Sequence, residues 1–152
     1  MISARALGDE LNRLLATETR TLARHLEGAP PYISAATFRV WREIKAMAAR
    51  SLDHARTLSE LLLALELPEE SMPFSSDVAR FHDTSVETLL PELIAEKERQ
   101  VAAYRRAIEH ARGDDRVRAA LQALLDENLS QLETLRQAKR TLTGEDAAAA
   151  TR

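Results

Sequence analysis

The chain has 152 residues, of which 45% are hydrophobic and 30% are charged, and its formal net charge is −3. A chain of this length forms one ordinary domain whose core is large enough to fold without disulfides or metals. The absence of cysteine excludes disulfide scaffolds, thiolate metal sites and cysteine nucleophiles. The balance of 24 Asp and Glu against 21 Lys and Arg argues against a nucleic-acid-binding surface.

The sequence contains no apolar run long enough to span a membrane, and charges near its N-terminus interrupt the pattern of a signal peptide. We therefore expect a cytoplasmic protein with no membrane partner. Only 4% of the residues are aromatic. The residues Ala, Leu, Glu and Arg dominate, which is typical of a helical protein. The composition predicts an all-α fold.

Apolar residues recur at helical spacing in four stretches of the chain. The first covers about residues 3–27 and ends at the stop signal Gly28-Ala29-Pro30-Pro31. The others cover about residues 34–67, 84–113 and 114–144. Together they predict a single four-helix-bundle domain over residues 1–143, followed by a flexible tail over residues 144–152.

The connection between the second and third helices, about residues 68–83, is much longer than the other two connections. Short turns make antiparallel neighbours, whereas a connection of this length can return along the whole bundle and leave its two flanking helices parallel. The pattern favours the one-crossover plan of ferritin-like bundles. A slack loop in a simple up-and-down bundle is the alternative.

Each predicted helix carries polar side chains within its apolar stripe, near the middle of its length. A four-helix bundle places its cofactor chemistry at such positions. By this spacing Asp53 and Glu96 face outward. The residues predicted to form a buried polar network are Glu18, Ser51, His54, Lys97, Asn128 and Gln131. A second register of the last helix, with Glu127 and Ser130 inward, stays open.

Short segments of all four helices resemble bacterioferritin and the wider ferritin-like superfamily, over roughly residues 7–140. The segments are LNRLLATE at 11–18, DHARTLSELL at 53–62, AYRRAI at 103–108 and DENLSQLE at 126–133. The resemblance implies a di-iron site built from four carboxylates and two histidines, because two hard cations must be bridged and neutralised. Glu18 and His54 match ligands of that pattern.

The remaining ligand positions depart from the family pattern. Ser51 and Lys97 stand where the family has glutamates, and the second histidine is missing from the last helix in either register. An ammonium group at Lys97 should repel a metal. We therefore expect no cofactor and a metal-free network in which Lys97 balances Glu18. Haem, which bacterioferritin binds through a methionine, is not expected because Leu52 stands at that position.

Two functional readings follow from these positions. The first is a ferritin-like bundle without ferroxidase activity, which acts as a structural or protein-interaction module and self-associates through its helix faces. The second is a metalloprotein that binds one Fe, Mn or Zn ion through Glu18 and His54, with His25 or Glu127 as a further ligand. We predict no catalytic residue.

Overall fold

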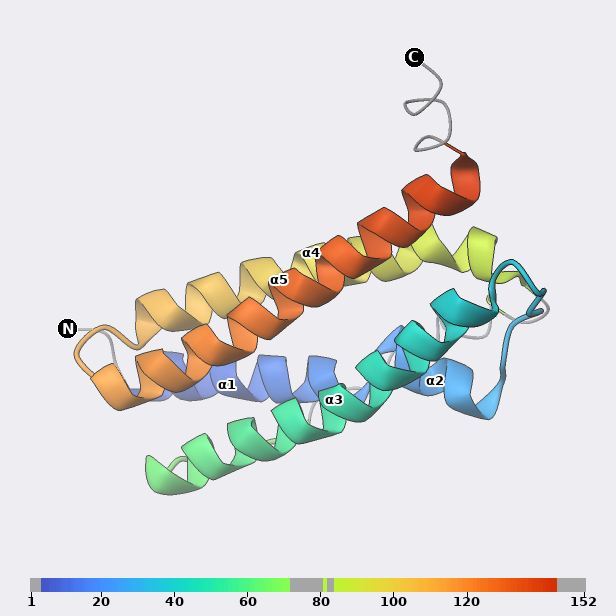
Figure 1. Cartoon of the computed structure of the whole chain (residues 1–152). Helices are drawn as coiled ribbons and strands as arrows, with labels where there is room; N and C mark the ends of the chain where they lie inside the picture. Colours follow the sequence, from blue (N-terminus) through green and yellow to red (C-terminus); the bar gives the residue numbers. More distant parts are fainter. Residues whose placement is uncertain (1–3, 72–80, 82–83, 145–152) are drawn as a thin grey trace, which may run out of the picture.

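The computed structural model describes residues 4–71, 81 and 84–144, and within them the predicted all-helical character is confirmed. Four long helices form the framework, and a short helix, α2, precedes the second long one (Figure 1). The helices are α1 (Ala4–Thr19), α2 (Leu22–Gly28), α3 (Phe38–Ala64), α4 (Val86–His110) and α5 (Asp115–Thr143). No helix in the described part of the chain is long and apolar enough to cross a membrane.

In Figure 1 the chain runs in one direction along α1 and α5 and in the opposite direction along α3 and α4. The α4–α5 turn is short, and Asp114 caps the start of α5 by accepting a hydrogen bond from the Val117 N–H at 3.0 Å. The predicted crossover falls mostly on residues 72–80 and 82–83, which lie outside the described residues, as do residues 145–152 of the predicted tail.

The single first helix expected at residues 3–27 is wrong, because the structure divides this stretch into α1 and α2. Threonine hydroxyls form hydrogen bonds on both sides of the break. Thr19 donates to the backbone oxygens of Leu15 and Ala16 at 2.9 and 3.0 Å, and Thr21 caps α2 by accepting the Arg24 N–H at 3.3 Å. Side chains of this type compete with the helical hydrogen-bond ladder and favour helix ends.

The first backbone N–H of α2 is bound by a side chain from another helix. Both carboxylate oxygens of Glu96 accept from the Leu22 N–H, at 3.0 and 3.2 Å. The prediction that Glu96 faces outward is therefore wrong. A carboxylate at a helix N-terminus satisfies an otherwise unpaired donor and complements the helix dipole.

Glu96→Ala should loosen α2 and lower the free energy of unfolding by about 1–2 kcal/mol, because it removes the acceptor of the Leu22 N–H. Urea unfolding and hydrogen exchange at the Leu22 amide measure the two effects. Glu98→Ala is the matched control, since Glu98 is exposed and pairs with Arg136 at 3.2 Å. Equal exchange rates at Leu22 in both variants would contradict the assignment.

The apolar core consists of two clusters separated along the bundle. The first joins α1 to the C-terminal half of α3, the C-terminal half of α4 and the first part of α5, and includes Leu11, Leu58 and Leu121. The second joins α2 to the N-terminal halves of α3 and α4 and includes Leu26 and Ile44. Burying these clusters supplies the main stabilisation of the fold.

Candidate functional site

A layer of buried polar side chains lies between the two apolar clusters. This layer lies at the C-terminal end of α1, where the helix is interrupted before α2. All four long helices contribute residues to it. Its members with 5% exposure or less are Glu18 from α1, Ser51 and His54 from α3, Lys97 and Gln100 from α4, and Asn128 from α5. Polar groups at this depth must be paired to be tolerated.

Glu18 is fully buried and lies at the centre of this layer. Its Oε1 atom accepts a hydrogen bond from the Tyr104 hydroxyl at 2.7 Å and another from the Asn128 amide at 3.4 Å. The Nδ1 atom of His54 lies 3.3 Å from the same oxygen. Its Oε2 atom has no partner among the described residues.

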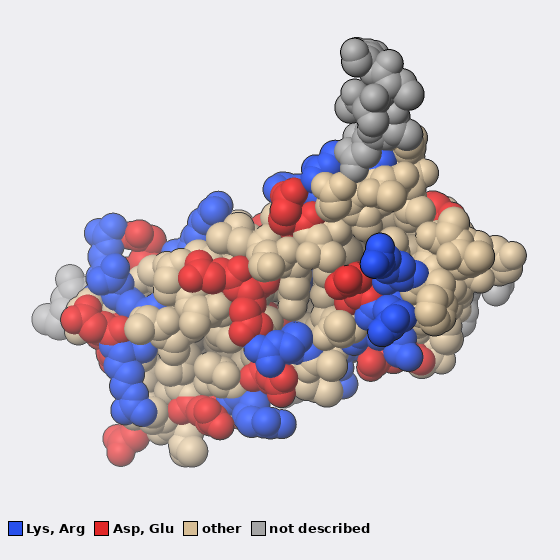
Figure 2. All heavy atoms as spheres, viewed as in Figure 1, with Lys and Arg blue, Asp and Glu red and all other residues tan. Residues whose placement is uncertain are grey.

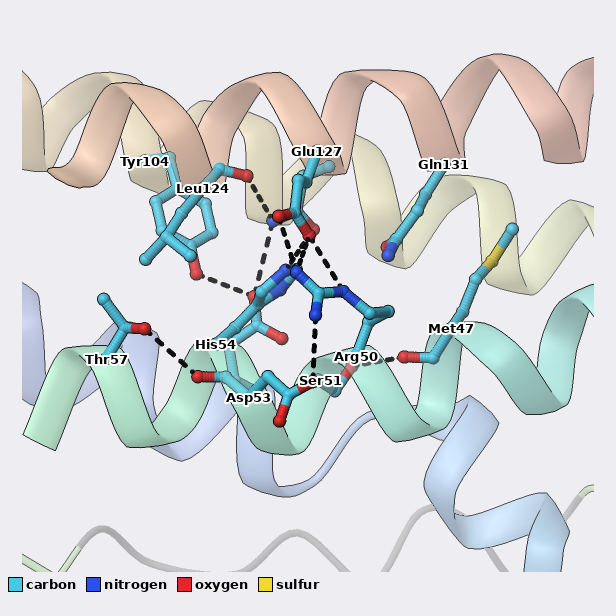
Figure 3. A network of polar contacts seen from close by, with 12 residues as sticks. Met47, Arg50, Ser51, Asp53, His54, Thr57, Tyr104, Leu124, Glu127 and Gln131 are labelled. Atoms are coloured by element: carbon cyan, nitrogen blue, oxygen red, sulfur yellow. Dashed lines mark hydrogen bonds and ion pairs between the residues drawn. The ribbon is translucent and has the colours of Figure 1, made fainter. Parts of the chain in front are cut away.

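His54 lies between two carboxylates from different helices. Its Nδ1 atom faces Glu18, and its Nε2 atom lies 2.6 Å from Oε2 of Glu127 on α5. Arg50, one turn before His54 on α3, donates three hydrogen bonds of 2.6 to 3.2 Å to the carboxylate of Glu127. Figure 3 shows this chain of contacts crossing from α3 to α5. It runs from the buried Glu18 to Arg50 and Glu127, which are partly exposed to solvent.

Lys97 is buried but does not contact Glu18 directly. Its Nζ atom donates to Oδ1 of Asn128 at 3.0 Å and to Oε1 of Gln131 at 2.7 Å. Asn128 then donates to Glu18 from the other end of its amide. The predicted balance between Glu18 and Lys97 is therefore relayed through an amide, because no ion pair joins the two in the described part of the chain.

Ser51 is hydrogen-bonded within its own helix, whereas Gln131 joins the network through Lys97. Ser51 is buried, but its hydroxyl donates to the Met47 backbone oxygen of its own helix at 3.1 Å. Gln131 is only half-buried and lies at the edge of the layer. The structure combines the two predicted registers of α5. Asn128 is fully buried, as in the first register, and Glu127 contacts His54 from a partly exposed position, while Ser130 is exposed.

The electrostatics of the layer keep Glu18 ionised despite its depth. Burial alone would raise its pKa, but the hydrogen bond and charge of His54, the Tyr104 hydroxyl and the charge of Lys97 lower the pKa below its usual value. Burial alone would lower the pKa of His54, but its contacts with Glu18 and Glu127 raise that pKa above its usual value. Burial lowers the pKa of Lys97, against the pull of Glu18 and Glu96. The layer therefore contains its own cations.

The pKa shifts predict a pH window for stability. The pKa of His54 is raised above 6.5, so its contribution is fully present below pH 6.5 and is lost as pH rises through its folded-state pKa. The pKa values of Glu18 and Glu127 are lowered from 4.5. The contribution of these two carboxylates to stability is therefore present above pH 4.5 and is lost as pH falls through their folded-state pKa values. Urea unfolding across this range should show the alkaline loss in the wild type and not in His54→Gln. An unchanged alkaline slope in that variant would count against the assignment.

The donor set does not fit the di-iron site that the sequence resemblance implies. Ser51 offers a hydroxyl that is already used by its own helix, and Lys97 offers a cation. Both ring nitrogens of His54 face carboxylates, which leaves neither free for a metal. In the described part of the chain, His25 is not among the hydrogen-bond or ion-pair partners of Glu18 and His54. Across the described ranges, no group of three or more His, Asp or Glu side chains could hold a metal ion.

Two residues of the layer were not predicted as its members. Tyr104 was not among the predicted network residues, and its hydroxyl donates a hydrogen bond to Glu18. Gln100, 1% exposed, has no partner among the described residues for either of its amide atoms. The spacing of Gln100, three residues after Lys97, was the available signal.

Comparison with known proteins adds no identity: no protein-family model matches the chain, and no curated protein matches its sequence.

Proposed function

We propose that this chain is a ferritin-like helical bundle without ferroxidase chemistry, which serves as a structural or protein-interaction module. Its buried polar layer holds the four helices in register and takes the place of a metal centre. The observation that carries this proposal is that two buried basic side chains, His54 and Lys97, lie within the layer, with His54 against Glu18 and Lys97 joined to it through Asn128. They provide the positive charge that Glu18 needs.

The one-crossover topology is part of this proposal, and contacts at both ends of the long connection support it. At its start, Asn12 of α1 donates to the Pro68 backbone oxygen at 3.0 Å and accepts from the Glu70 N–H at 2.8 Å. At its end, the Tyr32 N–H donates to the Thr84 oxygen at 2.8 Å. Asn12 lies in α1 and Tyr32 lies beyond α2, so the connection begins and ends at different levels of the bundle.

The surface supports a protein partner better than a nucleic acid. Figure 2 shows acidic and basic side chains interspersed over the visible face, without a broad basic area. Exposed large apolar side chains are present as well, at Tyr32, Phe38, Leu52 and Leu63. We propose a cytoplasmic protein that self-associates through its helix faces.

Metal analysis tests the metal-free layer. The purified protein is reconstituted anaerobically with Fe(II), Mn(II) or Zn(II), and bound metal is measured by mass spectrometry for the wild type, Glu18→Ala and His54→Ala. We expect less than about a tenth of an equivalent of bound metal per chain, with the same value in the wild type and both variants. A true metal site would instead lose affinity when one of its ligands is removed. Stoichiometric binding that either substitution abolishes would overturn the proposal and favour a one-metal protein.

A further inference from the structure

Three buried polar atoms of the layer lack a hydrogen-bond partner within the described part of the chain. Two belong to the side-chain amide of Gln100 on α4, a residue that is 1% exposed. The third is the Oε2 atom of the fully buried Glu18. Polar atoms at this depth cost free energy unless another group pairs with them. Their pairing is therefore a question that the side chains of the layer leave unanswered.

Gln100 lies on the side of α4 that faces the interruption between α1 and α2. Residues four positions apart share one face of a helix, so Gln100 lies in a row with Glu96 and Tyr104. Glu96 accepts from the Leu22 N–H at the start of α2, and Tyr104 donates to Glu18 near the end of α1. The Gln100 side chain is therefore placed one helical turn from the contact that holds Glu18.

The polar side chains on either side of Gln100 in α4 are already hydrogen-bonded to other groups. Lys97 donates to two side-chain amide oxygens of α5, at 2.7 and 3.0 Å. The Tyr104 hydroxyl donates to the Oε1 atom of Glu18 at 2.7 Å, which leaves Oε2 of the same carboxylate outside this bond. A small molecule between Gln100 and Glu18 pairs the remaining atoms without rearranging the layer.

The chemistry of the unpaired atoms selects a neutral molecule that both donates and accepts hydrogen bonds. The Gln100 amide offers a donor, and Oε2 of Glu18 is an acceptor. An anion would meet the Glu18 carboxylate, and a cation would add positive charge beside His54 and Lys97 and accept nothing from the amide. Water meets both requirements, and proteins bury roughly one water per 27 residues, typically with about three hydrogen bonds each.

We infer that the layer binds an ordered water molecule, which accepts a hydrogen bond from the Gln100 amide and donates one to Oε2 of Glu18. This inference rests on the proposed metal-free layer and deepens it, because a metal ion bound by Glu18 would compete for the same carboxylate. The water connects α4 to the end of α1, and Gln100 is the residue that positions it.

NMR of the wild-type chain detects this water directly, through rotating-frame Overhauser cross-peaks between water and the side-chain amide protons of Gln100. We expect cross-peaks with the sign of dipolar contact rather than of proton exchange. Gln100→Met identifies the amide signals by their loss. Tyr104→Phe removes a nearby hydroxyl whose exchanging proton can mimic a bound water, and the cross-peaks should persist in this variant.

Oxygen-17 relaxation dispersion counts the long-lived waters and provides a second measurement. Gln100→Met keeps the length of the side chain but removes the amide, so the dispersion should fall by about one water molecule relative to the wild type. Gln122→Met is the matched control, because Gln122 is exposed on α5, and it should leave the dispersion unchanged.

Three results would each overturn the bound water. They are the absence of cross-peaks at Gln100 in the wild type, the loss of these cross-peaks in Tyr104→Phe, and an undiminished dispersion in folded Gln100→Met. The wild-type measurement stands by itself if Gln100→Met does not fold. Any of these results with a metal-free protein would leave the proposed function intact, whereas stoichiometric metal that removes the cross-peaks would overturn both.

Discussion

Glu18→Ala is expected to lower the free energy of unfolding by about 3–5 kcal/mol, the range for removing one partner of a buried charge network. The Oε1 atom of Glu18 receives the Tyr104 hydroxyl and the Asn128 amide, and it lies against His54. Without it, the Tyr104 hydroxyl has no acceptor and the buried cations lose the anion at their centre. Urea denaturation with a two-state fit measures the loss.

Glu18→Gln is the matched control for this prediction. It keeps the volume and one acceptor oxygen but removes the charge, so its cost should be smaller than that of Glu18→Ala. The pKa of His54 should fall in this variant, because Glu18 helps to raise it. A loss of less than about 1 kcal/mol in Glu18→Ala, within the range of surface substitutions, would show that the layer contributes little to stability.

Lys97→Ala is expected to have a similar cost, about 3–5 kcal/mol, for the complementary reason. The substitution leaves the Oδ1 atom of Asn128 and the Oε1 atom of Gln131 without their donor, and it removes a cation that stabilises Glu18. Lys97→Met keeps most of the volume and separates the loss of charge from the cavity.

The Lys97 variants also distinguish the relay through Asn128 from a simple packing role. Lys97→Ala in an Asn128→Leu background should cost less than Lys97→Ala alone, because the amide that connects Lys97 to Glu18 is already absent. Additive losses in this double-mutant cycle would contradict the relay.

The fold class and the depth of the polar layer could be predicted from apolar periodicity, because Glu18, His54 and Lys97 each replace an apolar residue in a regular stripe. The break before α2 could not, since it depends on Glu96 of a distant helix binding the Leu22 N–H. Local sequence offered only the threonines at positions 17, 19 and 21, which are tolerated in many continuous helices.

The partners within the layer were less predictable than its members. Periodicity places a side chain on a face but does not say which atoms meet, so Glu18 and Lys97 were expected to pair directly, whereas Asn128 separates them. Glu127 was predicted to face inward only in the second register of the last helix, and its contact with His54 was not predicted. It lies beside the stripe and remains 41% exposed, yet its carboxylate reaches across the seam between α3 and α5 to His54.

We propose that cations of the chain itself, rather than a metal, neutralise Glu18, and the charge state of His54 tests this proposal most directly. A pH titration of histidine ring signals by NMR, with His54→Gln used for assignment, follows this group. We expect His54 to titrate with a pKa above 6.5 and its ring signals to be unaffected by added Zn(II). A neutral ring that titrates at or below 6.5 and shifts with stoichiometric Zn(II) would contradict the account.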